Sequence, residues 1–485
     1  MDRKQKTNSV LLILSILLLV VSIPSSSSAL RYHTLVLNPQ SQKHETPVQH
    51  NPFTETNPKN SLTLELIHRE QLIPPAVSNI NTREALLLSR LERDRLRVEA
   101  LSNHVAAATQ AESFSGPVIS GMAFGKAEYL VRLGVGTPAK QLYLALDTGS
   151  DLVWLQCRPC KSCYKQADRI FDPRKSTSFS NLSCDSPLCK QLINTNYEYS
   201  NCSYSKSCLY SASYGDGSYT IGNLSTETLT FGTDTVENVT VGCGHDNSGT
   251  QDGYAGLLGL GRGSLSFPRQ IGNNKFSYCL ASLFTNSSNP PSKSSSITFG
   301  DSRIKANFTP LLQNPDSQLN SFYYVSLKGI SVGGDPVSKI MPSHFEMGSN
   351  GSGGVIVDSG TSFTYLNQKA YEPLRDAFRK AFMNSTNLTV IKTEYMFDTC
   401  YDFTGLKNVT VPSVVLHFEG VDMDLPADNI FVKMDYNGTY CFGFVGQEDG
   451  FSVIGNMIQQ GFRVLYDLDK NRIGFTPDAC PMPSG

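Results

Sequence analysis

The sequence predicts an all-β fold. Turn-forming residues are abundant, with 38 glycines and 25 prolines among 485 residues. Between them, valine, threonine and tyrosine recur in short runs, a pattern typical of strands joined by turns. A strand–turn motif also occurs twice, as described below. The charged fraction of 17% and the net charge of −2 are ordinary for a globular protein and give no indication of a polyanionic partner.

The first copy of the motif is "LALDTGSDLVWLQC", residues 144–157. Alternating leucines at 142, 144 and 146 predict a strand that ends at Asp147 and enters a turn. A carboxylate beside a core strand must be hydrogen-bonded or paired, because burying it otherwise costs free energy. A single Asp-Thr-Gly would by itself be ordinary turn chemistry.

The second copy, "GVIVDSGTSFTYL" at 354–366, places Asp358 in the same frame. An apolar-apolar-glycine element follows each copy, ending at Gly259 and at Gly455. We therefore expect an internal duplication whose pseudo-twofold axis brings the two aspartates into one site.

Two carboxyl groups at such close range do not both ionise easily, so the pair holds one proton over a wide pH range. The ionised member can then take a proton from water while the neutral member donates one to a carbonyl oxygen. Glycine at the second position after each aspartate lets a backbone N–H approach the carboxylate, and neighbouring hydroxyls supply further donors. These supporting residues are Thr148, Gly149, Ser150, Ser359, Gly360 and Thr361.

Residues 1–29 have the features of a secretory signal peptide. Basic residues precede an apolar run from Val10 to Ile23, which a serine tract and Ala29 follow. A membrane anchor is the alternative, but this run is shorter than the about 20 residues needed to span a bilayer. We expect no membrane anchor and entry into the secretory pathway. The apoplast is the expected destination, with the vacuole and the endoplasmic reticulum as alternatives.

Residues 30–116 contain no cysteine and end in a helical pattern. In "TREALLLSRLERDRLRVEAL" (82–101) leucines recur at helical spacing, with Thr82 as a candidate N-cap. An independent helical domain is one interpretation, but the stretch is too short to bury much core alone. We favour a removable pro-segment that packs on the body, with the mature chain beginning between Ala106 and Lys126.

All 12 cysteines lie between Cys157 and Cys480, and an even number in a secreted chain indicates disulfides. The spacing of Cys157, Cys160 and Cys163 could instead suggest a metal site, but no fourth ligand follows at a suitable distance. We therefore expect no metal. Eleven N-x-S/T sequons, all in the same region, predict a glycoprotein.

With these motifs, residues 129–476 resemble the pepsin-type aspartic proteases (family A1), and among them the nepenthesin-like plant enzymes. The family's catalytic aspartates correspond to Asp147 in "DTGS" and Asp358 in "DSGT". Its flap tyrosine corresponds to Tyr214 in "SYGDGS", and its structural tryptophan to Trp154. The strand-like "LTLELIHRE" (62–70) resembles a pro-segment strand of these proteins.

The resemblance implies a bilobed double β-barrel with pseudo-twofold symmetry and a central substrate cleft, its lobes spanning about 117–310 and 311–485. It also implies an aspartic endopeptidase that acts on extended peptides as a monomer, without a cofactor, and that binds pepstatin-type inhibitors. The disulfides it implies are Cys157–Cys160, Cys163–Cys243, Cys184–Cys208, Cys189–Cys202, Cys279–Cys480 and Cys400–Cys441.

Two other functions are alternatives for a chain with this body. Xylanase-inhibitor relatives keep this body without catalysis, but here both aspartates and the flap tyrosine are present. Nucleic-acid binding is described for some relatives, yet this body has a slight excess of acidic residues and no basic run. We expect a protease, with a catalytically silent binding protein of the same fold as the alternative and no nucleic-acid partner.

Overall fold

The structure is a computed structural model of the whole chain. It describes residues 31–37, 62–69, 87–99, 129–194, 200–214, 218–249, 253–281, 295–300, 305–316, 319–393, 396–434, 438–448 and 451–477. The expected signal peptide, Thr82, the flap turn at Asp216-Gly217 and Cys480 lie outside these residues. In the described part of the chain, no helix is both long and apolar enough to cross a membrane.

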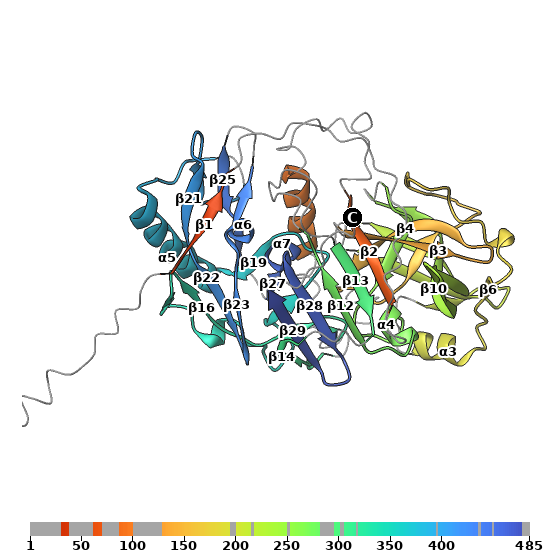
Figure 1. Cartoon of the computed structure of the whole chain (residues 1–485). Coiled ribbons are helices and arrows are strands. Elements are labelled where there is room, and N and C mark those ends of the chain that lie inside the picture. Colours follow the sequence, from red (N-terminus) through yellow and green to blue (C-terminus); the bar gives the residue numbers. More distant parts are fainter. Residues whose placement is uncertain are drawn as a thin grey trace, which may run out of the picture.

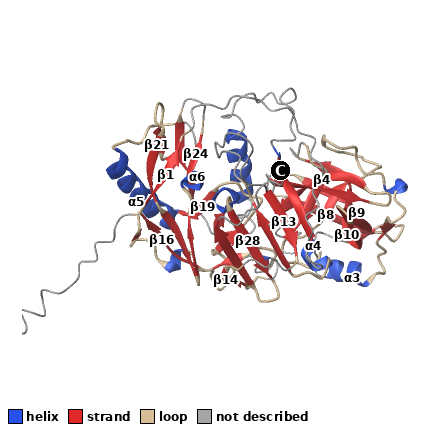
Figure 2. Cartoon of the chain, in the orientation of Figure 1, coloured by secondary structure: helices blue, strands red, loops and turns tan. Residues whose placement is uncertain are grey.

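The fold is mostly β and bilobed, as predicted (Figures 1 and 2). A central antiparallel sheet connects the lobes. Its strands, in spatial order, are β3 (Tyr129–Val135), β2 (Leu62–His68), β13 (Ser295–Phe299), β12 (Lys275–Cys279), β28 (Phe462–Asp467), β29 (Arg472–Pro477) and β14 (Asn307–Leu312). The first residues of the body and the last described ones thus share one sheet.

The N-terminal lobe is built on the long hairpin of β9 and β10 and carries the first aspartate motif. Its strands are β4 (Lys140–Asp147), β5 (Trp154–Gln156), β6 (Ser180–Asn181), β7 (Asn201–Cys202), β8 (Cys208–Ser213), β9 (Tyr219–Phe231), β10 (Asp234–Ser248) and β11 (Gly256–Gly259). Its helices are η2 (Pro173–Lys175), α3 (Pro187–Asn194) and α4 (Phe267–Gln270). The expected alternation in β4 is confirmed, because Leu142, Leu144 and Leu146 are all buried.

The C-terminal lobe carries the second motif. Its strands are β15 (Tyr324–Val325), β16 (Leu327–Val332), β17 (Asp335–Pro336), β18 (Val355–Val357), β19 (Thr364–Asn367), β20 (Cys400–Asp402), β21 (Asn408–Pro412), β22 (Val414–Phe418), β23 (Val421–Asp424), β24 (Phe431–Lys433), β25 (Thr439–Phe442), β26 (Phe444–Gln447) and β27 (Ser452–Ile454). Its helices are η5 (Pro342–His344), α5 (Gln368–Thr386), α6 (Ala427–Ile430) and α7 (Asn456–Gln459).

Helix α5 illustrates how the sequence sets an element. Asn367 caps its first turn by accepting a hydrogen bond from the N–H of Lys369, and Asn387 ends it in the left-handed conformation. Between them Leu374, Phe378 and Phe382 recur at four-residue spacing and are fully buried. The helix is thereby fixed to the core of this lobe.

The internal duplication is confirmed by strand pairing. In the N-terminal lobe β11 runs parallel to β4 and pairs antiparallel with β5. In the C-terminal lobe β27 runs parallel to β18 and pairs antiparallel with β19. A Cβ on Gly259 or Gly455 would lie 2.4 Å or 2.0 Å from the backbone of the crossing loop, so each apolar-apolar-glycine element needs its glycine for close approach.

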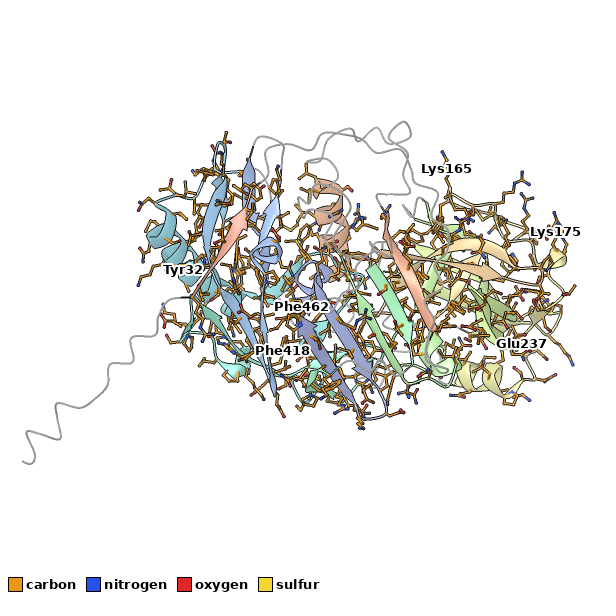
Figure 3. All side chains as sticks on the ribbon, viewed as in Figure 1. Tyr32, Lys165, Lys175, Glu237, Phe418 and Phe462 are labelled. Carbon is orange, nitrogen blue, oxygen red and sulfur yellow. A yellow bond between two sulfur atoms is a disulfide. The ribbon has the colours of Figure 1, made fainter. Side chains whose placement is uncertain are left out.

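Three parts of the region before residue 117 pack on the body. Strand β1 (Tyr32–Val36) pairs with β21 of the C-terminal lobe, so Tyr32 lies at the opposite end of the molecule from Lys175 and Glu237 (Figure 3). Strand β2 lies between β3 and β13 in the central sheet. A helix over residues 87–99, orange-brown in Figure 1, lies between the lobes.

The disulfide pairing corrects four of the implied bonds. The structure contains Cys157–Cys243 and Cys160–Cys163 in place of Cys157–Cys160 and Cys163–Cys243. Strand β5 runs parallel to β10, with Leu155 opposite Cys243. Cys157 follows Leu155 by two residues, so this register brings it close to Cys243. Cys157 and Cys243 thus come to a Cα–Cα distance of 5.3 Å, within the range that a disulfide requires.

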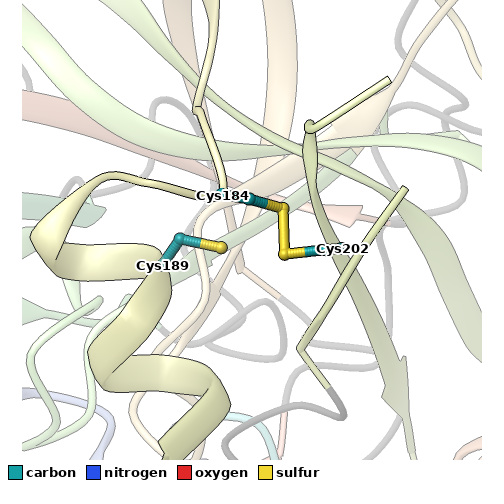
Figure 4. Close-up of side chains that lie close together, drawn as sticks. All are labelled: Cys184, Cys189 and Cys202. Atoms are coloured by element: carbon teal, nitrogen blue, oxygen red, sulfur yellow. A yellow bond between two sulfur atoms is a disulfide. The ribbon is translucent and has the colours of Figure 1, made fainter. Parts of the chain in front are cut away.

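The structure likewise contains Cys184–Cys202 and Cys189–Cys208 in place of Cys184–Cys208 and Cys189–Cys202. Cys202 and Cys208 are cross-strand neighbours. The sequence alone therefore does not show which of them pairs with Cys184 and which with Cys189. The buried Cys208 pairs with the buried Cys189, and the exposed Cys202 pairs with Cys184. Figure 4 shows Cys189 beside the Cys184–Cys202 bond; because all three sulfurs are in disulfides, this cluster offers no thiolate to a metal.

The implied Cys400–Cys441 bond is confirmed. Cys279 is disulfide-bonded, whereas its implied partner Cys480 lies outside the described residues.

Candidate active site

Both aspartates lie in turns at the ends of buried strands, where β4 and β18 leave the sheet. The N–H of Gly149 donates to Asp147 Oδ1 at 3.0 Å, and the Ser150 hydroxyl donates to Oδ2 at 2.7 Å. This turn therefore orients the first carboxylate through the donors that the sequence predicted.

The second turn has the same contacts. The N–H of Gly360 donates to Asp358 Oδ1 at 2.9 Å, and the Thr361 hydroxyl donates to Oδ2 at 2.5 Å. The equivalence of the two turns is what a pseudo-twofold axis through the site requires.

Reciprocal hydrogen bonds join the two turns. The N–H of Ser359 donates to the Thr148 hydroxyl at 2.9 Å, and the N–H of Thr148 donates to the Ser359 hydroxyl at 3.2 Å. All six supporting residues predicted around the aspartates thus lie in the two turns, and these bonds fix the separation of the carboxyl groups.

The site is occupied by an arginine from the region before residue 117. Arg97, on the helix over 87–99, places its Nη2 at 2.6 Å from Asp358 Oδ2 and 3.1 Å from Asp147 Oδ1. Its Nε donates to Asp358 Oδ2 at 2.7 Å. All three residues are at most 2% exposed. One guanidinium therefore pairs with both carboxylates and excludes solvent from the space between them.

The site's electrostatics follow from this burial. Burial raises the pKa of Asp147; the charge of Arg97 opposes the rise and that of Asp358 adds to it. Burial also acts to lower the pKa of Arg97, but the two carboxylates outweigh it and raise that pKa above its ordinary value. Arg97 is consequently charged at every physiological pH.

A second charged residue of the same helix binds the C-terminal lobe just after the second aspartate turn. Asp94 Oδ2 accepts hydrogen bonds from the N–H groups of Ser362 and Phe363, at 2.9 and 2.7 Å. Its Oδ1 accepts one from the Ser362 hydroxyl at 3.2 Å. Leu87 and Leu91 of this helix pack in the C-terminal lobe's core cluster with Phe363.

Tyr214 and Trp154 lie together on the N-terminal side. Tyr214 follows β8, and its N–H donates to the carbonyl of Ser218, which precedes β9, at the end of the β8–β9 pairing. Its ring centroid is 6.1 Å from that of Trp154, which is fully buried. The tryptophan thus supports the base of the hairpin, while the turn itself lies outside the described residues.

Comparison with known proteins agrees with these features. Models described as xylanase inhibitor N-terminal and C-terminal domains match residues 129–301 and 322–477. Aspartyl protease family protein 2 of Arabidopsis thaliana is 45% identical, over 97% of this chain and 98% of its own. The chain belongs to the pepsin-type aspartic protease family. Within this family it is 40% identical to aspartic proteinase nepenthesin-1 of Nepenthes gracilis, over 73% of this chain and 79% of the relative.

Solved structures of this aspartic protease fold are also similar. The structure of edgp has a TM-score of 0.56 at 20% identity, over 72% of this chain and 91% of its own. Soybean basic 7S globulin has a TM-score of 0.55 at 20% identity, over 74% of this chain and 94% of its own. At this identity the likeness concerns the fold alone.

Sequence reasoning about this aspartic protease family member missed Arg97 and Asp94. Both lie on the buried face of the helix, together with Arg90, Leu87 and Leu91. Charged side chains on the apolar face of an amphipathic helix need partners, because they are almost never fully buried unless paired. That placement was the available signal that the helix binds a charged surface.

Proposed function

We propose that this chain is the precursor of an aspartic endopeptidase that hydrolyses peptide bonds with a water molecule activated between Asp147 and Asp358. The observation that carries the proposal is the equivalent pair of buried carboxylates, each oriented by a glycine N–H and a hydroxyl. With Arg97 withdrawn, the two carboxyl groups face one another and share a proton.

In the proposed reaction the ionised carboxylate takes a proton from water, and the resulting hydroxide attacks the peptide carbonyl carbon. The protonated carboxyl group donates its proton to the carbonyl oxygen. Collapse of the tetrahedral intermediate breaks the C–N bond: one carboxyl group gives its proton to the leaving nitrogen, while a hydroxyl of the intermediate returns a proton to the other carboxylate as the C=O bond re-forms. The dyad ends with the single proton with which it began, and no cofactor takes part.

The pro-segment is proposed to keep the enzyme latent. The Arg97 guanidinium occupies the position between the carboxylates where the water must bind. Protonation of Asp147 or Asp358 removes the negative charge on which its ion pair with Arg97 depends. Lowering the pH therefore favours release of the helix.

The mature chain is expected to begin between Ala106 and Lys126. Cleavage must detach the helix over 87–99 and preserve β3, which starts at Tyr129 in the central sheet. Purified secreted protein should be acidified, assayed on a denatured protein substrate, and subjected to N-terminal sequencing before and after. An active product whose chain still runs unbroken from Leu30 would refute removal of the pro-segment.

A catalytically silent binding protein is the alternative, and the same assay distinguishes it. Folded protein that has lost the helix but cleaves no substrate at acidic pH would support that alternative. We further propose that the enzyme acts as a monomer in the apoplast; the disulfides fit an oxidising compartment.

A further inference from the structure

We propose that the mature enzyme has a carboxylate-binding subsite formed by Ser362 and Phe363, and that it prefers substrates with an acidic side chain near the scissile bond. The inference rests on the proposed endopeptidase function. It starts from Asp94, which occupies this position in the latent form.

The donor geometry suits a carboxylate. Two N–H groups converge on one oxygen of Asp94, and the Ser362 hydroxyl donates to the other. A single carboxylate accepts all three bonds at once, as Asp94 does, whereas one backbone carbonyl oxygen would accept only the two N–H bonds. Hydrogen bonds to an ionised acceptor are also about twice as strong as neutral ones.

The donors become available when the pro-segment leaves. Asp94 is 3% exposed and Ser362 4%, so the helix shields these groups from water in the latent form. Phe363 also packs against Leu87 and Leu91 of the helix in one cluster. Release of the helix opens this part of the cleft, and a bound substrate is then the group that can satisfy the three donors away from water.

The helix also indicates where the acidic residue should lie. Asp94 precedes Arg97 by three residues, which is about 4.5 Å along a helix axis. An extended peptide rises about 3.3 Å per residue. The acidic residue should therefore lie within about two residues of the bond that is cleaved, always on the same side.

Steady-state kinetics on matched peptides test this. One peptide carries glutamate at the position that cleavage profiling of a peptide library identifies; its partners carry glutamine or leucine there. Mature wild-type enzyme should show a kcat/KM for the glutamate peptide about tenfold above that for the leucine peptide, with glutamine between them and the difference mainly in KM.

Two variants make the test specific. Ser362→Ala should bring the glutamate-to-leucine ratio of kcat/KM closer to one, because one of the three donors is lost. Ser331→Ala, in the outer sheet of the same lobe where Ser331 Oγ contacts His417, should keep the wild-type ratio. The substrate comparison uses unaltered enzyme, so it does not depend on how either variant folds.

The outcomes separate the subsite from the protease assignment. Equal rates on the glutamate and leucine peptides, by an enzyme that cleaves both, would overturn the subsite and leave the endopeptidase intact. Cleavage of neither peptide, nor of a denatured protein, by folded mature protein would overturn both.

Discussion

Purified mature Asp358→Asn protein is expected to lose nearly all proteolytic activity, by about 10³-fold or more, since general acid–base catalysis contributes about 10²- to 10⁴-fold. Asparagine has almost the same shape and still accepts the hydrogen bond from the Gly360 N–H. It has no proton to exchange with Asp147, so the pair can neither activate water nor protonate the carbonyl. Asp147→Asn should have an equal effect.

The matched control is Asp335→Asn, in the exposed strand β17 of the same lobe. It should retain the wild-type rate on denatured protein, and thermal unfolding should show that all variants are folded. Wild-type turnover by purified Asp358→Asn enzyme would contradict a mechanism that depends on both aspartates.

The full-length Arg97→Gln protein is expected to lose its latency. Removing one partner of a buried ion pair costs about 3–5 kcal/mol, which corresponds to about 100-fold to a few thousand-fold in the equilibrium for pro-segment release. The uncut variant should hydrolyse peptide within the first minutes after acidification, whereas wild type should show a lag until its chain is cut. Gel electrophoresis at each time point verifies chain length.

Arg95→Gln provides the matched control on the same helix. Arg95 is 45% exposed on its side chain and pairs with Glu92 and Glu99 at the surface. Exposed pairs contribute little to stability, so this variant should keep the wild-type lag. A full wild-type lag in Arg97→Gln would show that Arg97 does not hold the enzyme latent.

The duplicated fold and the dyad were predictable because their signals are local and repeated. Alternating leucines define β4. In each of the two Asp-[Ser/Thr]-Gly turns, the glycine N–H donates to the aspartate and orients it. The helical pattern before residue 117 was also predictable, and the described helix covers residues 87–99 of the expected 82–101.

The remaining features depend on contacts between distant segments. The partners of Cys202 and Cys208 were predicted wrongly because these two cysteines are cross-strand neighbours. Which of them faces α3 depends on burial. The role of Arg97 depends on docking of its helix against two turns that lie in different lobes and are far apart in the sequence. Neither register nor docking is encoded by spacing along the chain.

The central claim, that two aspartates share one proton and activate water, is tested most directly by a pH–rate profile of the purified mature enzyme. The reaction needs one carboxyl group protonated and one ionised, so the rate should be maximal between the two apparent pKa values of the pair. With Arg97 bound, burial raises the pKa of Asp147 most, Asp358 adds to the rise and the charge of Arg97 opposes it. In the mature enzyme the adjacent carboxyl groups still repel each other when both are charged, which raises the upper apparent pKa of the pair. The shared proton is lost as the pH rises through that pKa, leaving two adjacent charges and no acid to polarise the carbonyl.

The profile should be recorded on a denatured protein substrate, with circular dichroism at each pH to follow folding. Disulfides such as Cys157–Cys243 and Cys400–Cys441 should keep the body folded independently of the dyad. We predict a maximum in acid and a decline toward neutrality while the protein remains folded. A maximum at about pH 8 with little activity at about pH 4, in protein folded at both, would contradict the shared-proton dyad.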